Sequence, residues 1–189
     1  MAAGNKVIGS GRPAPYIVPT MKINEMLLAQ LERETAISRR LLARVPEGKP
    51  DWKPHEKSMA LGYLAALVAT MPGWIAMMVQ QDSLDLNPPG GSSYRRPEWK
   101  TVGDLTGLLD DGAAQARKAL SGTTDEHLGT PWKLLVGGRT VGESPRHQSI
   151  SDTLTHVAHH RGQLSVYMRL LNVPLPSIYG PTADEGWSH

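Results

Sequence analysis

Four long segments of this chain repeat apolar residues at the spacing of an α-helix, and stretches rich in proline or glycine separate them. The first segment begins near Thr20 and ends at Val45, just before a proline. The second follows Ser58, whose hydroxyl can cap its first turn. Pro72 lies inside this second pattern, where we expect it to kink the helix or to mark an irregular turn.

The other two segments lie in the second half of the chain. One covers Thr101 to Leu120, and Asp104 completes a pattern close to a capping box at its start. The last can be capped by Ser149 or Ser151 and ends before Pro174. Four substantial helices with a long connection after the second favour an all-α fold, most simply a four-helix bundle.

Between the third and the last of these segments the pattern changes. Residues 132–136 and 139–141 are two short runs that flank Gly137-Gly138, which predicts a small β-hairpin or an extended excursion before the last helix. At the other end of the chain, residues 1–19 are rich in Gly, Pro and Ala and are expected to form a flexible N-terminal arm. Residues 20–189 are then expected to form a single domain.

Composition excludes several classes of function. Lys and Arg total 20 against 18 Asp and Glu, which gives a net charge of +2, and the basic residues are dispersed among acidic ones. We therefore expect no nucleic-acid partner. No apolar run reaches the roughly 18 residues that span a bilayer, so no membrane partner is expected. The chain has no cysteine, so nitrogen and oxygen must hold any metal, and a reducing cytoplasm is the expected location.

The last helical segment carries the strongest functional motif, His156-Val-Ala-His-His160. Side chains four residues apart lie on one face of a helix, so His156 and His160 can direct two nitrogens to one divalent ion, zinc or nickel. The apolar arc of this helix places the pair beside a groove at the edge of the core, and His159 is expected to point away from it. The alternative is two partly buried histidines that hydrogen-bond across the bundle.

The residues around this motif resemble those of the DinB-like superfamily of bacterial helical proteins. The resemblance is carried by His156 to Leu164, by Tyr167 to Leu171, by Ser58 to Ala65 and by Trp52-Lys53-Pro54. It implies an up-up-down-down four-helix bundle, a homodimer, and a divalent ion, nickel or zinc, held by three histidines. It also implies a metal-dependent enzyme of the thiol S-transferase or hydrolase type, with a small molecule or a thiol as substrate.

By this resemblance His156 and His160 are two of the three ligands, and the third position falls on Leu67, which cannot coordinate a metal. The histidine triad of this chain is therefore incomplete. A replacement ligand could come from another histidine or from a carboxylate of the first helix. The candidates are His55, His127, His147, Glu25 and Glu32.

Three further residues of the last helix are candidates for supporting a metal or positioning a substrate: Arg161, Gln163 and Tyr167. Arg161 has an alternative role, in which it pairs with a carboxylate on a neighbouring helix. Two alternative functions also follow from the apolar residue at position 67. The bundle can be a catalytically inactive binding module, or a structural dimer in which the tail from Pro174 to Trp187 packs between subunits.

Overall fold

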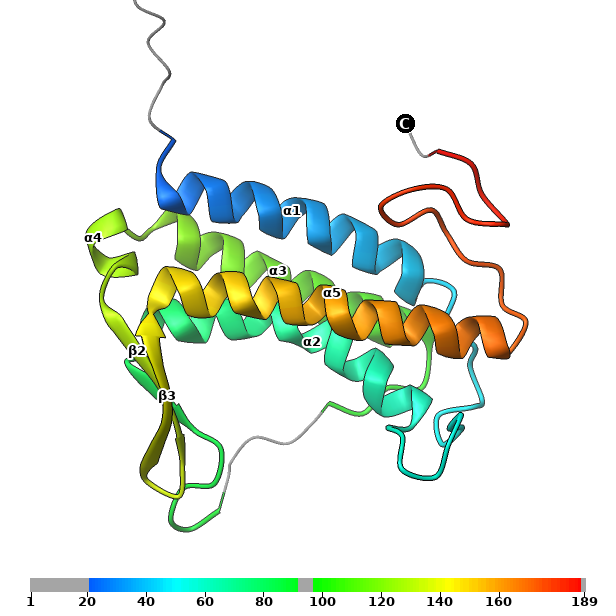
Figure 1. Ribbon diagram of the computed structural model, residues 1–189, viewed down its shortest axis with the longest axis horizontal. Helices are drawn as coiled ribbons and strands as arrows, with labels where there is room; N and C mark the ends of the chain where they lie inside the picture. Colours follow the sequence, from blue (N-terminus) through cyan, green and yellow to red (C-terminus); the bar gives the residue numbers. More distant parts are fainter. Residues whose placement is uncertain (1–20, 92–96, 188–189) are drawn as a thin grey trace, which may run out of the picture.

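The computed structural model describes residues 21–91 and 97–187, and the predicted N-terminal arm lies outside them. The described chain is mostly helical with a small three-stranded sheet at one end (Figure 1). Four long helices lie side by side, and one short helix, Asp125–Leu128 (α4), precedes the sheet strands that lead to the last of them. The long helices are α1 (Ile23–Leu42), α2 (Leu61–Gln80), α3 (Val102–Ser121) and α5 (Arg146–Leu170).

The helix directions differ from the predicted up-up-down-down order. The backbone amide of Ile23, at the start of α1, donates to Asp125 just beyond the end of α3 (3.1 Å). Arg146, at the start of α5, donates from Nε to the carbonyl of Met78 near the end of α2 (3.1 Å). Thus α1 and α5 run one way and α2 and α3 run the other (Figure 1). The up-up order was wrong because the loop after α1 stays at one end of the molecule and reverses the chain at once.

That loop also explains where α2 begins. Ser58 does not cap the helix, which starts at Leu61 with Ala60 at the N-cap position and no side-chain cap. The loop supplies the acceptors instead, since the amides of Leu61 and Gly62 donate to carbonyls of the loop at 2.9 and 2.8 Å. By contrast, Thr101 and Asp104 form the predicted capping box at the start of α3.

The core consists of two apolar clusters separated by a layer of buried polar residues. One cluster lies near the sheet and includes Leu27, Leu31, Ile75, Ala116, Leu120, Ile150 and Leu154. The other lies at the opposite end and includes Leu41, Leu64, Val68, Leu105, Leu109, Leu164 and Met168. Between them along α1 and α5 lie four buried polar side chains, which we call the polar layer: Glu34, Ser38, His160 and Arg161.

Helices α2 and α3 approach each other closely at the same level. A Cβ atom on Gly112 would lie 3.0 Å from the backbone nitrogen of Gly73, a tighter contact than most Cβ atoms make, so the absence of a side chain at Gly112 favours this close approach. Pro72 does not end α2, which continues through it to Gln80. Among the described helices, α2 alone is long and apolar enough to cross a membrane, but 67% of that stretch is buried in the protein core, as in a soluble domain.

The predicted hairpin is present as β2 (Pro131–Val136) and β3 (Arg139–Pro145), which pair antiparallel. A third strand that the sequence pattern did not indicate, β1 (Ser83–Asp85), pairs in parallel with β2. The buried guanidinium of Arg146 ties the sheet to α2, because it donates to Asp82 and to the carbonyls of Met78 and Pro131. Helix α5 therefore begins at Arg146, one turn before the predicted caps at Ser149 and Ser151.

Candidate metal centre

The two histidines of the motif lie next to each other on α5. The ring centroids of His156 and His160 are 4.4 Å apart, with the ring planes inclined by 38°. His160 is 7% exposed and belongs to the polar layer, whereas His156 lies one turn earlier and is exposed. The pair therefore has one ring in the protein interior and one at the surface, and both rings lie on one face of the helix.

His159 does not point away from this pair, so that expectation was wrong. Its ring centroid lies 5.1 Å from that of His160 and 6.3 Å from that of His156. The reason is geometric, because a separation of three residues rotates a side chain by only about 60° around a helix. The three imidazoles thus form one group on α5, the histidine cluster, in which His156 and His159 are exposed and His160 is buried.

Gln163 connects two of these imidazoles. The Oε1 atom of Gln163 accepts a hydrogen bond from Nδ1 of His160 (2.9 Å), and its Nε2 donates to Nε2 of His159 (3.0 Å). An amide oxygen only accepts, so Nδ1 of His160 carries the proton. In the neutral ring Nε2 of His160 is then unprotonated, which is the state that a metal-ligating nitrogen needs.

The electrostatics of the cluster also favour a neutral His156. Partial burial lowers the pKa of His156, and repulsion from His160 and His159 lowers it further. Because a metal competes with protons for imidazole nitrogen, a lowered pKa increases the fraction of His156 that is free to coordinate at neutral pH.

No third ligand joins the pair. Within residues 21–91 and 97–187, no group of three His, Asp or Glu side chains is arranged to hold a metal. Thr153 of α5 lies beside Met78 of α2 (3.5 Å), and the two helices are antiparallel. Counting along both helices places His160 near the level of Met71, with half-buried Leu67 one turn farther along α2. By this count Leu67 lies one turn beyond the level of His160, toward the N-terminus of α2, and its apolar side chain offers no donor.

The other histidines proposed as replacements are engaged elsewhere. His127 donates from Nε2 to the carbonyl of Val79 (2.8 Å), and His147 donates from Nδ1 to the carbonyl of Leu128 (3.1 Å). Both lie near the sheet. His55 lies in the exposed loop before α2, where its Nδ1 accepts from the backbone amide two residues later.

The two carboxylates proposed as replacements have local partners as well. Glu25 accepts from the backbone amide of Lys22 at the start of α1 (3.3 Å). Glu32 forms a two-pronged ion pair with Arg117 of α3, at 2.6 and 2.9 Å. Neither faces the histidine cluster, so the donor set remains two imidazoles.

Arg161 does not contact the histidines and instead forms the ion pair that was the alternative to a role at the metal site. Its Nη2 donates to Glu34 of α1 (2.5 Å), and its Nη1 donates to the hydroxyl of Ser38 (3.0 Å). Tyr179 of the tail completes the network, because its hydroxyl accepts from Arg161 and donates to Glu34 (2.7 Å). Arg161 therefore faces α1 and the tail, while the ring of His160 beside it lies next to those of His156 and His159.

Glu34 was not identified from the sequence, although a signal was present. Glu34 and Ser38 interrupt the apolar face of α1 between Leu31 and Leu41, and a charged residue at such a position usually has a buried partner. Burial by itself raises the pKa of the Glu34 carboxyl. Hydrogen bonds from Tyr179 and Arg161 and the charge of Arg161 outweigh this effect, so the pKa lies below its usual value.

Tyr167 lies two turns beyond His160 on α5 and packs edge-on against Trp52, with ring centroids 5.6 Å apart. This contact belongs to the apolar cluster far from the sheet. Of the three residues proposed to support the site, only Gln163 thus contacts the histidines directly.

Comparisons with known proteins agree with this architecture. No curated protein matches the chain. Among solved structures it is similar to a DinB-like protein from Bacillus subtilis, with a TM-score of 0.62 and 18% identity over 80% of this chain and 96% of that one. A DinB-like protein from Bacillus cereus is similar to the same degree, at 0.62 and 19% over 82% and 97%. These likenesses concern the fold.

The sequence supplies the family assignment directly. Residues 30–164 match the profile of the DinB superfamily, and this segment runs from the middle of α1 through the histidine cluster of α5. It covers well over half of the chain and includes both His156 and His160. The protein therefore belongs to the DinB superfamily.

Proposed function

We propose that this protein binds a divalent ion, nickel or zinc, through His156 and His160. The observation that carries the proposal is the hydrogen bond from Nδ1 of His160 to Gln163, which leaves Nε2 of His160 free to coordinate. The lowered pKa of His156 supplies a second neutral imidazole one turn away. Gln163 would hold the ring of His160 in place, as hydrogen-bonded neighbours of metal ligands commonly do.

The two imidazoles fit a two-nitrogen site and not a complete three-histidine centre. Such a site leaves most coordination positions to water or to a thiol, so binding is expected to be weaker than in a complete centre. A bound ion would lower the pKa of a coordinated water or thiol, which suits a hydrolase or a thiol S-transferase. We propose a small molecule or thiol as the substrate class and the cytoplasm as the location.

The proposed metal site depends on how the four long helices pack together. We propose that α1, α2, α3 and α5 form a closed four-helix bundle, with the histidine cluster at the edge of its core. The polar layer supports this, because Arg161 of α5 reaches across to Glu34 and Ser38 of α1. A fixed rotation of α5 would keep the ring of His160 beside that of His156.

Leu67 favours a second function, a catalytically inactive bundle that acts as a binding or dimeric interaction module. An apolar side chain stands at the position where the family resemblance implies the third histidine. A site without that nitrogen could have lost its ion while the fold was kept.

The first test is metal uptake by protein purified without affinity resin, measured by equilibrium dialysis against nickel or zinc and elemental analysis. We expect about one ion per chain, because the two imidazoles offer a single chelating pair. His160→Ala should abolish uptake, whereas His55→Ala, which removes an exposed loop histidine, should leave it unchanged. Equal uptake by both variants would contradict the proposal and favour the binding module.

The second test completes the site. Leu67→His should raise metal affinity at least tenfold, since a third nitrogen near the pair makes the donor set of a stable zinc site. Leu67→Gln serves as the control, because it adds a polar side chain of similar size that is a poor ligand. If the histidine variant binds no more tightly than the glutamine variant, position 67 does not face the pair.

A further inference from the structure

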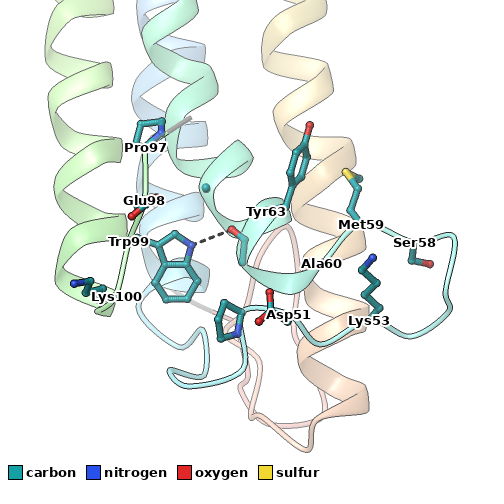
Figure 2. A pocket seen from close by; sticks show the side chains of 13 residues that line it. Asp51, Lys53, Ser58, Met59, Ala60, Tyr63, Pro97, Glu98, Trp99 and Lys100 are labelled. Carbon is teal, nitrogen blue, oxygen red and sulfur yellow. Dashed lines mark hydrogen bonds between the residues drawn. The ribbon is translucent and has the colours of Figure 1, made fainter. Parts of the chain in front are cut away.

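The edge of α2 that borders α5 is apolar and only partly covered. Helix α2 carries no charged residue along its whole length. Most of its residues are buried, but five that lie along one edge of the helix are half-buried: Tyr63, Leu67, Thr70, Trp74 and Met77. In Figure 2, Tyr63 points to the side of α2 on which α5 lies. The half-buried edge of α2 therefore runs along α5.

Helix geometry places Trp74 beside His156. The contact between Met78 and Thr153 (3.5 Å) fixes one point where the two helices meet. Trp74 lies four residues before Met78 and His156 lies three residues after Thr153, so on antiparallel helices both are about 5 Å from that point in the same direction.

The rotation around each helix gives the same result. Trp74 is rotated by about 40° from Met78, and His156 is rotated by about 60° from Thr153 in the same sense. On antiparallel helices, equal senses of rotation lead to the same side of the line of contact. Trp74 and His156 are therefore neighbours across the two helices.

The residues near the histidine pair on α2 are uncharged as well. By the same count Thr70 lies at the level of His160, and its hydroxyl donates to a carbonyl of its own helix (2.9 Å). Asp152 lies on this side of α5 too, but it is exposed and one turn nearer the sheet than His156. His159 is rotated farther away from α2. The α2 side of the histidine pair is thus formed by an aromatic ring and uncharged neighbours.

From this arrangement we infer that the metal site takes a small molecule with a flat apolar group, of the class of an aryl or arylalkyl thiol. Its sulfur end lies toward His156 and His160, and its flat group stacks on the half-buried indole of Trp74. Aromatic contacts of this kind add affinity beyond the area that they bury. The inference rests on the metal site proposed above and narrows its substrate class from any small molecule or thiol to an apolar one.

The test is a titration of zinc-loaded protein with phenylmethanethiol and with 2-mercaptoethanol, which lacks the ring. Isothermal titration calorimetry measures both affinities, and we expect phenylmethanethiol to bind at least fivefold more tightly. It should also shift the indole N–H signal of Trp74 in ¹H–¹⁵N spectra, a signal that its loss in Trp74→Gln identifies. The signal of Trp132, which is 5% exposed and packs near the sheet, should stay unchanged.

Matched variants separate this inference from the metal proposal. Trp74→Gln should lower the affinity for phenylmethanethiol about fivefold and leave that for 2-mercaptoethanol unchanged. Trp187→Gln, at a 69% exposed position of the tail, should change neither affinity. Circular dichroism and zinc content verify that each variant keeps the fold and the ion.

Three results overturn the inference while zinc uptake is normal. They are equal binding of the two thiols by the unmodified chain, an unshifted Trp74 signal, and an undiminished preference for phenylmethanethiol in Trp74→Gln. The comparison of the two thiols needs no variant, so it stands even if Trp74→Gln does not fold. Absence of zinc uptake by the unmodified chain would instead overturn the metal proposal, and this inference with it.

Discussion

At the scale of single residues, burial separates two ion pairs of similar chemistry. The Arg161–Glu34 pair joins side chains that are 1% and 6% exposed, whereas the Arg117–Glu32 pair joins side chains that are about half exposed. Water screens the exposed pair and solvates either partner if the other is lost. The buried pair has no such replacement, so removal of one charge leaves the other without compensation in the core.

Glu34→Gln should therefore lower the free energy of unfolding by about 3–5 kcal/mol, because the guanidinium of Arg161 stays buried without a counter-charge. Glu32→Gln, two residues earlier on α1, should cost less than about 1 kcal/mol. Urea denaturation of both variants measures the difference. Similar losses in the two variants would mean that burial does not set the strength of the Glu34 pair.

At the scale of elements, the close contact of α2 and α3 depends on two glycines. Gly73 and Gly112 bring the two backbones together, and a Cβ on Gly112 would lie only 3.0 Å from the backbone nitrogen of Gly73, so α2 would have to shift by a few tenths of an ångström. Backbone cannot rotate away as a side chain can, so the helices would have to separate. Gly107, one turn and a half earlier on α3, has no atom within 4 Å of its Cβ position.

Gly112→Ala is expected to destabilise the protein by about 1–3 kcal/mol through this overpacking. Gly107→Ala should instead stabilise it by up to about 1 kcal/mol, since alanine is the better helix former at an exposed position. Thermal unfolding followed by circular dichroism compares the two. A neutral Gly112→Ala would show that the helices separate without loss of packing.

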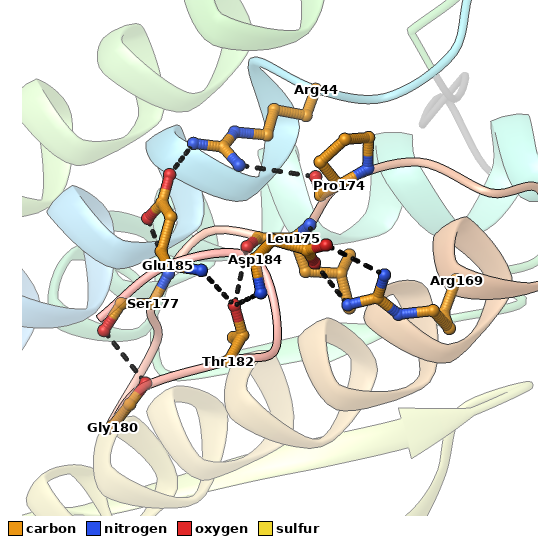
Figure 3. A network of polar contacts seen from close by, with 9 residues as sticks. All are labelled: Arg44, Arg169, Pro174, Leu175, Ser177, Gly180, Thr182, Asp184 and Glu185. Carbon is orange, nitrogen blue, oxygen red and sulfur yellow. Dashed lines mark hydrogen bonds and ion pairs between the residues drawn. The ribbon is translucent and has the colours of Figure 1, made fainter. Parts of the chain in front are cut away.

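The second feature at the scale of elements is the C-terminal tail, residues 174–187, which folds back on α1 and α5 (Figure 3). We call this folded segment the clasp. Asp184 pairs with Arg169 of α5 and accepts from the amide of Leu175 (2.8 Å). Glu185 accepts from the amide of Ser177 (2.9 Å) and pairs with Arg44. Two ionised carboxylates thus hold the segment that carries Tyr179 to the polar layer.

The clasp should open in acid. Hydrogen bonds from Arg169 and then Leu175 lower the pKa of Asp184, and those from Ser177 and then Arg44 lower the pKa of Glu185. Stabilisation from groups with lowered pKa is complete above their unfolded values, here 3.8 and 4.5, and is lost as pH falls through the lower folded values. The Leu175 and Ser177 amide signals in ¹H–¹⁵N spectra should shift below about pH 4.5.

A matched variant tests the cause. Arg169→Leu removes the largest contribution to the lowered pKa of Asp184, so the Leu175 signal should change at a higher pH than in the unmodified chain. The Ser177 signal, which reports on Glu185, should change less. If both signals keep their original midpoints, Arg169 does not hold the clasp.

At the scale of the whole molecule, the predicted homodimer remains a prediction. The exposed face of α5 carries Val166 and Leu170, each 58% exposed, beyond the histidine cluster. Burial of such side chains favours association in water.

Sedimentation equilibrium should therefore give twice the 20.6 kDa of one chain at micromolar concentration. Val166→Glu with Leu170→Glu should shift the mass toward that of one chain, because two charges would be desolvated in the interface. Val141→Glu, at a 50% exposed position of β3, is the control and should not change the mass. A single-chain mass for the unmodified protein would contradict the prediction.

Features that depend on neighbours along the chain could be predicted from the sequence. Helical spacing located four long helices, Thr101 and Asp104 marked the start of α3, and Gly137-Gly138 marked the hairpin, because each signal acts within a few residues. The adjacency of His156 and His160 followed from helix geometry alone. His159 lies close to both rings, contrary to expectation, because three residues rotate a side chain by only about 60° around a helix.

Tertiary structure decided what depends on residues far apart in sequence. Helix directions, strand β1, the starts of α2 and α5, and the pairing of Arg161 with Glu34 all rest on contacts between separate elements. Such contacts are stable only after the chain has closed large loops, so no local pattern announces them. The neighbouring positions of His156 and His160 could be predicted from the sequence, whereas the pairing of Arg161 with Glu34 depends on how α5 packs against α1.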